Sequence, residues 1–385
     1  MAHNNTLFSQ VLQFIPRHEF QKSVDRHFGD KGVRALTCWG QFSTLLFGQI
    51  TGHSSIRSMT TAINTQERFL YHLGMMPVKR STLSDANENR DPRILEGVFY
   101  NLLSRTQAYA PGHHFRFKGK ILAMDSSTIN LCLNLCPWAQ FHHEKGAFKL
   151  HTAIDLAGDL PTFMVMSAGK VHDIIIARRR TFEHGTTLLM DRGYIDFAWL
   201  YHLTEKGVYF VTRMKDNCQF KVRQSFEKDR KKGICADQEV RLTGVAGKKY
   251  SVRLRRISYC DPETGKRYVF ITNRFDLSAK TICDLYKARW KVELFFKTLK
   301  GQLQINKFVG TSENAVMWQV WTAMIAYLLI CLIRFINKVS WSVPCTMAAL
   351  AVGLFQKIDF KRLFGLLPRE RCINIGLQRQ LSLPF

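Results

Sequence analysis

Acidic residues are scarce in this chain of 385 residues: 30 aspartates and glutamates stand against 55 lysines and arginines, and the formal net charge is +25. Positive side chains in such excess repel one another unless a polyanion offsets their charge. Nucleic acid or an anionic membrane surface is therefore the expected partner. We find no internal repeat and no low-complexity tract. With 46% hydrophobic and 22% charged residues, the composition excludes a disordered, fibrous or collagen-like chain.

Paired cysteines and a targeting segment are also missing. The ten cysteines are scattered between Cys38 and Cys372, and Cys132 with Cys136 is too isolated to predict a zinc site. Residues 1–14 lack the basic start, apolar run and small-residue cleavage site of a secretory signal. These absences favour a reduced, cytoplasmic setting.

Long hydrophobic runs are rare, and a single one raises the question of a membrane anchor. Ala315 to Ile333 is interrupted only by Gln319 and Thr322, and its length is close to the ~20 residues that a membrane span needs. A wholly buried helix of a large α/β domain gives the same pattern. Because the rest of the chain is patterned as a soluble protein, we predict a buried helix.

The first 110 residues predict helices with little strand character. Ser54 and Ser81 suit the caps of two helices that can form a DNA-binding pair. A solvated helix face explains the same polar residues equally well. The polar candidates for contacts with bases or phosphates are Ser84, Asn87, Asn89 and Arg90. The predicted helices are Leu7 to Phe28, Arg34 to Ile50, Ser54 to Ile63, Ser81 to Arg90 and Pro92 to Ser104.

Strand patterns begin at Lys120. Three antiparallel-type strands are followed by alternating helices and strands, which predicts a mixed α/β sheet. The segment Gln219 to Lys266 interrupts this order with basic, hairpin-like sequence. Between Arg213 and Lys300 there are 23 lysines and arginines against 10 aspartates and glutamates, so the positive charge is clustered. Clustering of this kind favours a surface that follows DNA phosphates.

Two aspartates, Asp125 and Asp191, stand where an apolar strand gives way to polar turn residues. Side chains at strand ends reach a common edge of a mixed sheet, where carboxylates can hold a divalent cation and leave positions open for substrate. Each aspartate can also be read as an ordinary turn or capping residue.

A third acidic residue lies on a segment, Ser278 to Leu303, that predicts one long helix. At about 100° per residue, four of its polar residues share one face roughly 60° wide. A carboxylate among a phenol, a guanidinium and an ammonium suits a metal-bound phosphodiester. A face stabilised only by charge pairs, such as Arg289 with Glu293, is the simpler interpretation. The four residues of this face are Tyr286, Arg289, Glu293 and Lys300.

These residues resemble a known family. Asp125, Asp191 in a D-R-G-Y context and Glu293 within Y-x2-R-x3-E-x6-K are similar to the DDE triad and signature of bacterial insertion-sequence transposases of insertion-sequence family 4. The resemblance covers nearly the whole chain. It implies a ribonuclease-H-like mixed sheet with flanking helices, interrupted by a β-rich insertion and preceded by a helical N-terminal domain.

The resemblance also implies cut-and-paste transposition, with cleavage at the element ends followed by strand transfer. Asp125, Asp191 and Glu293 are then the catalytic and metal-binding residues for two Mg2+ ions, for which Mn2+ can substitute. The implied phosphate-binding positions are Tyr286, Arg289 and Lys300, with Arg192 and Tyr194 as weaker candidates. Relatives that form a DNA hairpin stack a flipped base on a tryptophan of the insertion. No tryptophan lies between Tyr201 and Arg289 here, so Tyr268 or Phe270 is the candidate replacement.

The expected partners are double-stranded DNA, carrying terminal inverted repeats or serving as target, and a second copy of the chain. No membrane is expected, and the site of action is the nucleoid in the bacterial cytoplasm. A transposase-derived DNA-binding regulator without activity, a plain metal-dependent nuclease and a membrane-anchored protein are the alternatives. The expected domains are 1–110 (helical, binding DNA ends), 118–218 with 267–340 (catalytic), 219–266 (basic insertion) and 341–385 (C-terminal helical segment).

Overall fold

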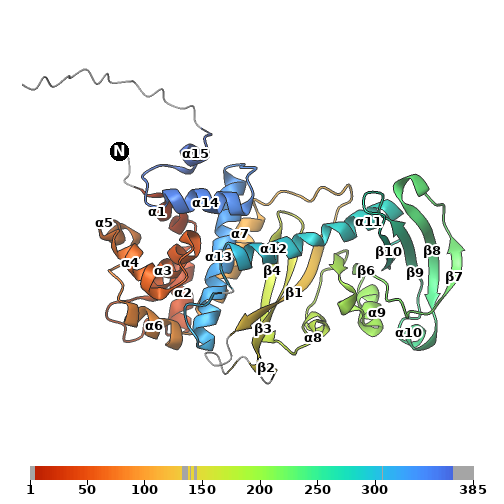
Figure 1. Ribbon diagram of the computed structural model, residues 1–385, viewed down its shortest axis with the longest axis horizontal. Helices are drawn as coiled ribbons and strands as arrows, with labels where there is room; N and C mark the ends of the chain where they lie inside the picture. The colour runs from red at the N-terminus through yellow and green to blue at the C-terminus, as the bar shows by residue number, and fades with distance from the viewer. Residues whose placement is uncertain (1–4, 132–137, 139, 143–144, 306, 367–385) are drawn as a thin grey trace, which may run out of the picture.

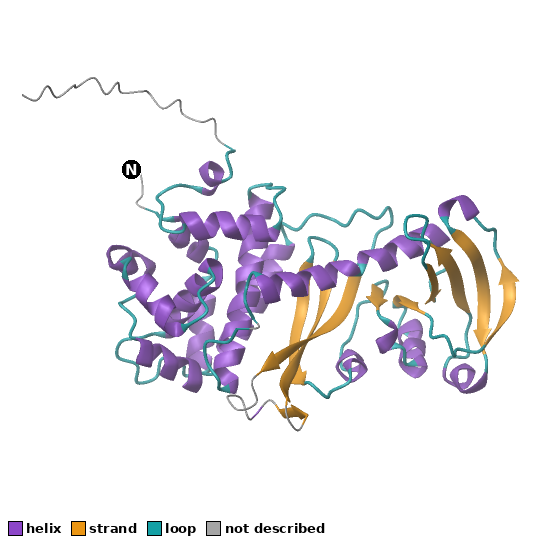
Figure 2. Ribbon diagram, viewed as in Figure 1, coloured by secondary structure: helices purple, strands orange, loops and turns teal. Residues whose placement is uncertain are grey.

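The computed structural model describes residues 5–131, 138, 140–142, 145–305 and 307–366. Helices gather at one end of the molecule, a sheet occupies the middle, and further strands form the other end, with two consecutive helices running across them (Figure 1; Figure 2). The cysteines Cys132 and Cys136 lie outside the described residues, as does the last part of the predicted C-terminal segment.

The N-terminal helices follow the predicted order, with the short α5 as an unpredicted addition and three further differences. Pro16 separates α1 from α2, so the single helix predicted from Leu7 is two, because proline removes a helical N–H donor. Ser55, not Ser54, caps α4 by accepting from the Ser58 amide. Ser81 lies inside α6 and caps nothing. The helices are α1 Leu7–Gln13, α2 Arg17–Arg26, α3 Cys38–Thr51, α4 Ile56–Asn64, α5 Glu67–Leu70, α6 Arg80–Asn89 and α7 Arg93–Gln107.

The middle of the molecule is a mixed sheet of ribonuclease-H-like topology. β1, β3 and β4 are antiparallel neighbours, and β5 and β6 then pair in parallel beside β1. The predicted fold class is therefore confirmed, although two of the predicted strands are joined in the single long β1. The strands are β1 Ile121–Leu131, β2 Gln140–His142, β3 Lys145–Asp155, β4 Leu160–Ala168, β5 Thr187–Met190 and β6 Tyr209–Arg213. Helices α8 Asp173–Arg178 and α9 Phe197–Glu205 connect the later strands.

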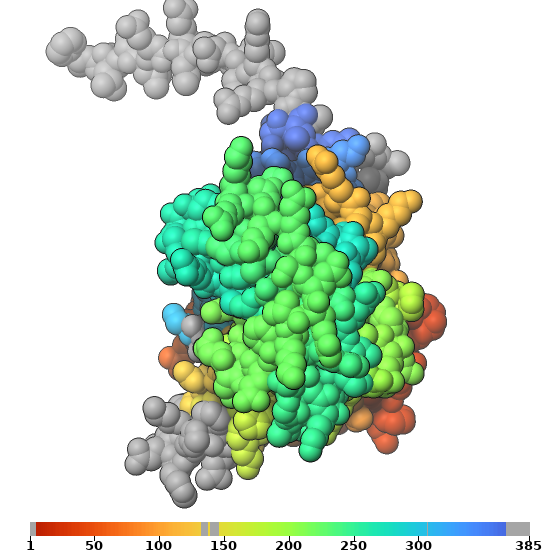
Figure 3. All heavy atoms as spheres, turned by 90° about the vertical axis from the view of Figure 1, so that its right-hand side faces the viewer, coloured from red at the N-terminus to blue at the C-terminus, as the bar shows by residue number. Residues whose placement is uncertain are grey.

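The basic segment after β6 extends the same sheet. Its strands continue the order as β6-β10-β9-β8-β7, with every new pairing antiparallel. Figure 3 looks onto this end of the molecule, where residues of the segment cover most of the visible face. The elements are β7 Phe220–Ser225, β8 Ile234–Leu242, α10 Gly244–Lys249, β9 Leu254–Cys260 and β10 Arg267–Thr272.

The helix predicted from Ser278 to Leu303 is two helices in succession, α11 Ala279–Ala288 and α12 Trp290–Gly301, which meet at Arg289. They are followed by α13 Glu313–Ile336, α14 Val343–Gly353 and α15 Phe360–Leu363. Among the described residues, α13 alone is long and apolar enough to cross a membrane, and 94% of its most apolar window is buried inside the protein. It contacts α3, α6 and α7, so it is the predicted core helix.

The two faces of the sheet belong to different hydrophobic clusters, and this decides where the aspartates point. Along β1, Ile121 and Ala123 join the large cluster that includes α12 and α13, whereas Leu122 and Met124 join the cluster around α9. Successive side chains of a strand alternate between faces. Asp125 therefore lies on the face covered by α12.

Candidate active site

Two of the predicted site residues, Asp125 and Asp191, lie at the same level of neighbouring parallel strands. The last parallel pair between β1 and β5 is Ala123 with Leu189, and each aspartate comes two residues later. Asp125 is therefore not at a strand end as predicted, because β1 continues to Leu131 with β3 as its partner. The strands diverge here instead, and that divergence opens the edge of the sheet beside both carboxylates.

Glu293 reaches this edge from α12, and Arg289 links it to the first aspartate. The Arg289 Nη2 atom donates to Glu293 Oε1 at 2.6 Å, and Nη1 lies 3.4 Å from Asp125 Oδ2. The side chain of Arg289 is 13% exposed, and its buried Nε has no hydrogen-bond partner. One guanidinium thus stands between two carboxylates that are far apart in the sequence.

Burial raises the pKa of the Asp125 carboxyl from 3.8 to about 6. The Ser126 amide and Arg289 lower this pKa, whereas the negative charges of Glu293 and Asp191 raise it further. All three carboxylates therefore lie within electrostatic reach of one another. Carboxylate oxygens that repel one another in a half-buried site are suitable ligands for a hard divalent cation, because the cation neutralises their charge.

In the part of the chain that the structure describes, no three His, Cys, Asp or Glu side chains are close enough to hold a metal ion together. The Arg289 guanidinium lies between two of the predicted ligands and forms ion pairs with both Asp125 and Glu293. The donor set fits a divalent cation in its chemistry, and a cation shared by Asp125 and Glu293 would take the place of the Arg289 guanidinium between them.

The other predicted phosphate-binding side chains lie along the same helices. The centroids of the Tyr286 and Phe270 rings are 4.7 Å apart. The Arg289 guanidinium lies 5.6 Å from the centre of the Tyr286 ring. The Lys300 ammonium donates to the Thr128 carbonyl at 2.9 Å and so ties α12 to β1. Arg192 is exposed directly after Asp191, at the edge of the site.

Three residues predicted to contact DNA are buried instead. Tyr194 is 3% exposed within the cluster around α9, and burial raises the pKa of its phenol. Asn87 is 1% exposed and accepts from Gln41, and Arg90 is held by Gln41 and the Leu36 carbonyl. These side chains stabilise the fold, whereas Ser84 and Asn89 remain exposed.

The two candidate base-stacking residues differ in accessibility. Phe270 is 3% exposed, so its ring is not available to an extruded base. Tyr268 is half-buried, stacks on Phe270 at 6.0 Å and has the Arg213 guanidinium 5.3 Å from its ring centre. Of the two, Tyr268 is therefore the suitable partner for a base.

Sequence reasoning missed a polar network behind the site. His151 on β3 pairs with Ser126, is 2% exposed and contacts the Ser167 hydroxyl at 2.8 Å. The Lys149 ammonium donates at 3.1 Å to Asp173, which lies 3.7 Å from His151. The signal available in the sequence was the histidine within the strand pattern of residues 149–156.

This network predicts acid sensitivity. Burial lowers the pKa of His151 from 6.5 to about 4, so the neutral imidazole stabilises the fold above pH 6.5 and that stability is lost as pH falls toward 4. When the pH is lowered from 7.5 to 5, the free energy of unfolding should fall in the parent by about 2 kcal/mol more than it falls in His151→Asn. Urea unfolding at both pH values measures it, with the exposed His202→Asn as control. Equal losses in parent and His151→Asn would contradict the assignment.

Carboxylates at the edge of a ribonuclease-H-like sheet, beside a strongly basic segment, are typical of enzymes that act on DNA. A sequence model described as "Transposase DDE domain" matches residues 116–329, and one described as a domain of unknown function (DUF4372) matches residues 3–76. The first match covers more than half of the chain. The protein therefore belongs to the DDE transposase family.

Two named transposases are similar to this chain in sequence, and one solved structure is similar to it in part of its fold. The chain is 30% identical over 283 residues to "Putative transposase y4zB" of Sinorhizobium fredii, covering 72% of this chain and 78% of the relative. It is 33% identical over 217 residues to "Probable transposase for insertion sequence element IS5377" of Geobacillus stearothermophilus, covering 56% and 57%. A cryo-EM structure of a piggyBac transposase synaptic complex with hairpin DNA has a TM-score of 0.46 and 11% identity, covering 95% of this chain and 83% of that one.

The prediction of a bacterial insertion-sequence DDE transposase is thus confirmed. The chain spans just over half the length of the relative from Geobacillus stearothermophilus. The placement of this protein in insertion-sequence family 4 stays a prediction.

Proposed function

We propose that this transposase cuts DNA at the ends of an insertion sequence and joins the freed ends to target DNA. Asp125, Asp191 and Glu293 are the proposed ligands of two Mg2+ ions, for which Mn2+ can substitute. The observation that carries the proposal is the level placement of the two aspartates, Asp125 within β1 and Asp191 directly after its parallel neighbour β5, with Glu293 joined to Asp125 through Arg289.

The bound ions would supply activation of the attacking oxygen and stabilisation of the leaving oxygen of the phosphodiester. The protein contributes position and charge. Bound cations would neutralise Asp125 and Glu293, the two carboxylates that Arg289 contacts. The Arg289 guanidinium would then be free to donate to a phosphate, with which guanidinium groups form strong paired hydrogen bonds. Tyr286, on the preceding turn, and Lys300, beside β1, provide further donors along the same face. Arg192 adds a cation at the rim.

Different parts of the chain have different proposed roles. Residues 1–110 bind the DNA ends, and residues 118–218 with 267–340 carry out the chemistry. Residues 219–266 follow the DNA backbone, which is supported by the exposed Lys221 and Arg223 on the edge strand β7. Of the C-terminal segment 341–385, the described helices α14 and α15 complete the helical end. We propose that two copies pair two DNA ends in the bacterial cytoplasm, at the nucleoid.

A direct test uses the purified protein and duplex DNA that carries the element's terminal repeats. With Mg2+ we expect cuts at the repeat ends followed by joined products, no cuts in EDTA, and recovery with Mn2+, because the carboxylates need a cation to act on phosphate. Sequencing gels detect both products, and sizing the protein with and without DNA tests pairing. Cuts without joined products would identify a plain nuclease. Tight DNA binding without cuts would identify a regulator.

A further inference from the structure

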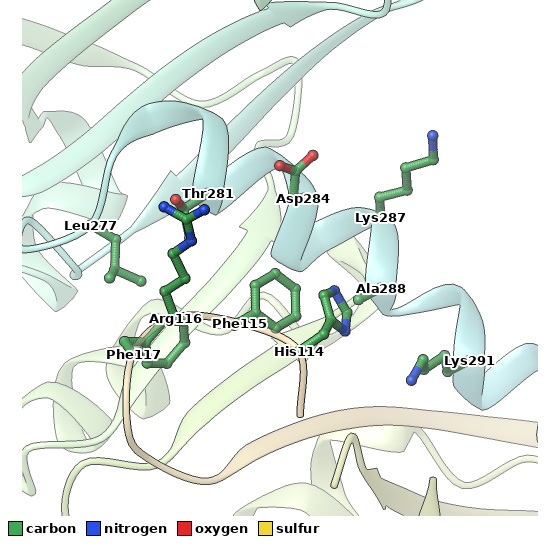
Figure 4. A pocket seen from close by; sticks show the side chains of 10 residues that line it. All are labelled: His114, Phe115, Arg116, Phe117, Leu277, Thr281, Asp284, Lys287, Ala288 and Lys291. Atoms are coloured by element: carbon green, nitrogen blue, oxygen red, sulfur yellow. The ribbon is translucent and has the colours of Figure 1, made fainter. Parts of the chain in front are cut away.

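A cavity of about 630 Å3 lies on the side of α11 away from the catalytic residues. One wall is the extended segment before β1, with His114, Phe115 and Arg116, and the other is α11 with Thr281 and Lys287. In Figure 4 the rings of His114 and Phe115 lie below the helix, Arg116 extends toward it, and Lys287 projects outward. We call this cavity the α11 groove. Its volume is that of a small-ligand site.

The floor of the α11 groove is aromatic and held in place. The His114 ring lies against Phe115, with centroids 4.2 Å apart and the ring planes tilted by 32°, and the centroids of Phe115 and Phe117 are 6.0 Å apart. Phe117 in turn lies 4.2 Å from the guanidinium of the buried Arg274. His114 itself is exposed, so a fixed ring face is presented to the solvent.

The rim of the α11 groove carries positive charge that is free to act on a ligand. Lys287 is 76% exposed, and its contact with Glu263 is a 3.9 Å surface pair of small energy. Arg116 is exposed and forms no ion pair within the described residues. The acidic residue of the lining, Asp284, is neutralised by Lys280 at 2.5 Å. The groove therefore favours an anion that also has an aromatic face.

We propose that the α11 groove binds a short stretch of single-stranded DNA, with a base stacked on His114 and phosphates beside Arg116 and Lys287. An intact duplex hides its base faces in its own stack, whereas a single strand offers them to an aromatic floor. At about 100° per residue, the groove-lining Ala288 lies roughly opposite Tyr286 on α11. A strand that leaves the catalytic face therefore meets the groove on crossing the helix. Only the identification of this strand as one released by cleavage rests on the proposed function.

The binding can be measured without metal or catalysis. Fluorescence anisotropy in EDTA compares a labelled twelve-nucleotide single strand with a duplex of the same length. We expect His114→Ala to weaken single-strand binding about tenfold, since stacking contributes about 1–3 kcal/mol per base, and His114→Phe to retain it. The double variant Arg116→Ala/Lys287→Ala is expected to lower the salt slope of single-strand binding by about 1.4. Duplex affinity changes less than about twofold in His114→Ala, because the duplex has no free base face to lose.

The matched control is Lys206→Ala, which replaces an exposed lysine at the C-cap of α9 and should leave both affinities unchanged. Unaltered single-strand binding in all groove variants would overturn the proposal. If His114→Ala weakens the binding of single strand and duplex equally, the proposal is also overturned. Concentration-dependent self-association that the groove variants abolish would overturn it too, because the groove would then bind a second copy of the chain. Because no cleavage is involved, a failure of the proposed function leaves this result standing, and the reverse also holds.

Discussion

Replacing Glu293 by glutamine lowers cleavage of end DNA about 1,000-fold or more while DNA affinity stays within a few fold, because a lost metal ligand removes about 4 kcal/mol of transition-state stabilisation. Glutamine keeps the volume, and its amide oxygen still accepts from the Arg289 guanidinium that now lies 2.6 Å from Glu293. The fold is thus preserved and the charge alone is lost. Cleavage is measured by single-turnover gels, and binding by anisotropy.

A matched control separates this effect from a general loss of negative charge. Glu205→Gln changes the same chemical group on an exposed position of α9 and should cleave like the parent. Calorimetric titration with Mg2+ in the absence of DNA should show weaker binding only for Glu293→Gln. If Glu293→Gln cuts DNA as fast as the parent, the assignment of this glutamate to the metal site is wrong.

Removal of Asp237 destabilises the protein by about 3–5 kcal/mol, because it leaves the Arg255 guanidinium buried without its counter-ion. Asp237 and Arg255 are 5% and 8% exposed and share two hydrogen bonds of 2.8 and 2.6 Å. Arg255 also donates to the Leu277 carbonyl, just before α11. The pair therefore joins the basic insertion to the helix that carries Tyr286. Urea unfolding of Asp237→Ala, followed by circular dichroism, measures the loss.

The same strand offers a control. Glu239, two residues along β8, pairs with Arg253 at 3.4 Å, but Arg253 is 67% exposed. Water screens this pair, so Glu239→Ala should cost no more than about 1 kcal/mol. If Asp237→Ala and Glu239→Ala lower the free energy of unfolding equally, burial does not make the Asp237–Arg255 pair more important for stability than the exposed pair.

Local patterns in the sequence predicted much of the candidate site. The polar face that holds Arg289 and Glu293 follows from helical geometry alone, and the helices that carry it differ from prediction only by the junction at Arg289. The salt bridge between Arg289 and Asp125 was not predictable, since 164 residues separate the two partners. Nor was the burial of Arg90, which depends on Gln41 and Leu36 from another helix region.

By itself the sequence determined the elements, the clustered positive charge and the family to which the protein belongs, because strand and helix periodicity and short motifs are local properties. The tertiary structure decided which polar residues face DNA and which stabilise the core. It also decided that Asp125 and Asp191 stand side by side where two parallel strands diverge, with Arg289 between two of the acidic groups. The physical reason is that burial and charge pairing depend on neighbours supplied by distant parts of the chain.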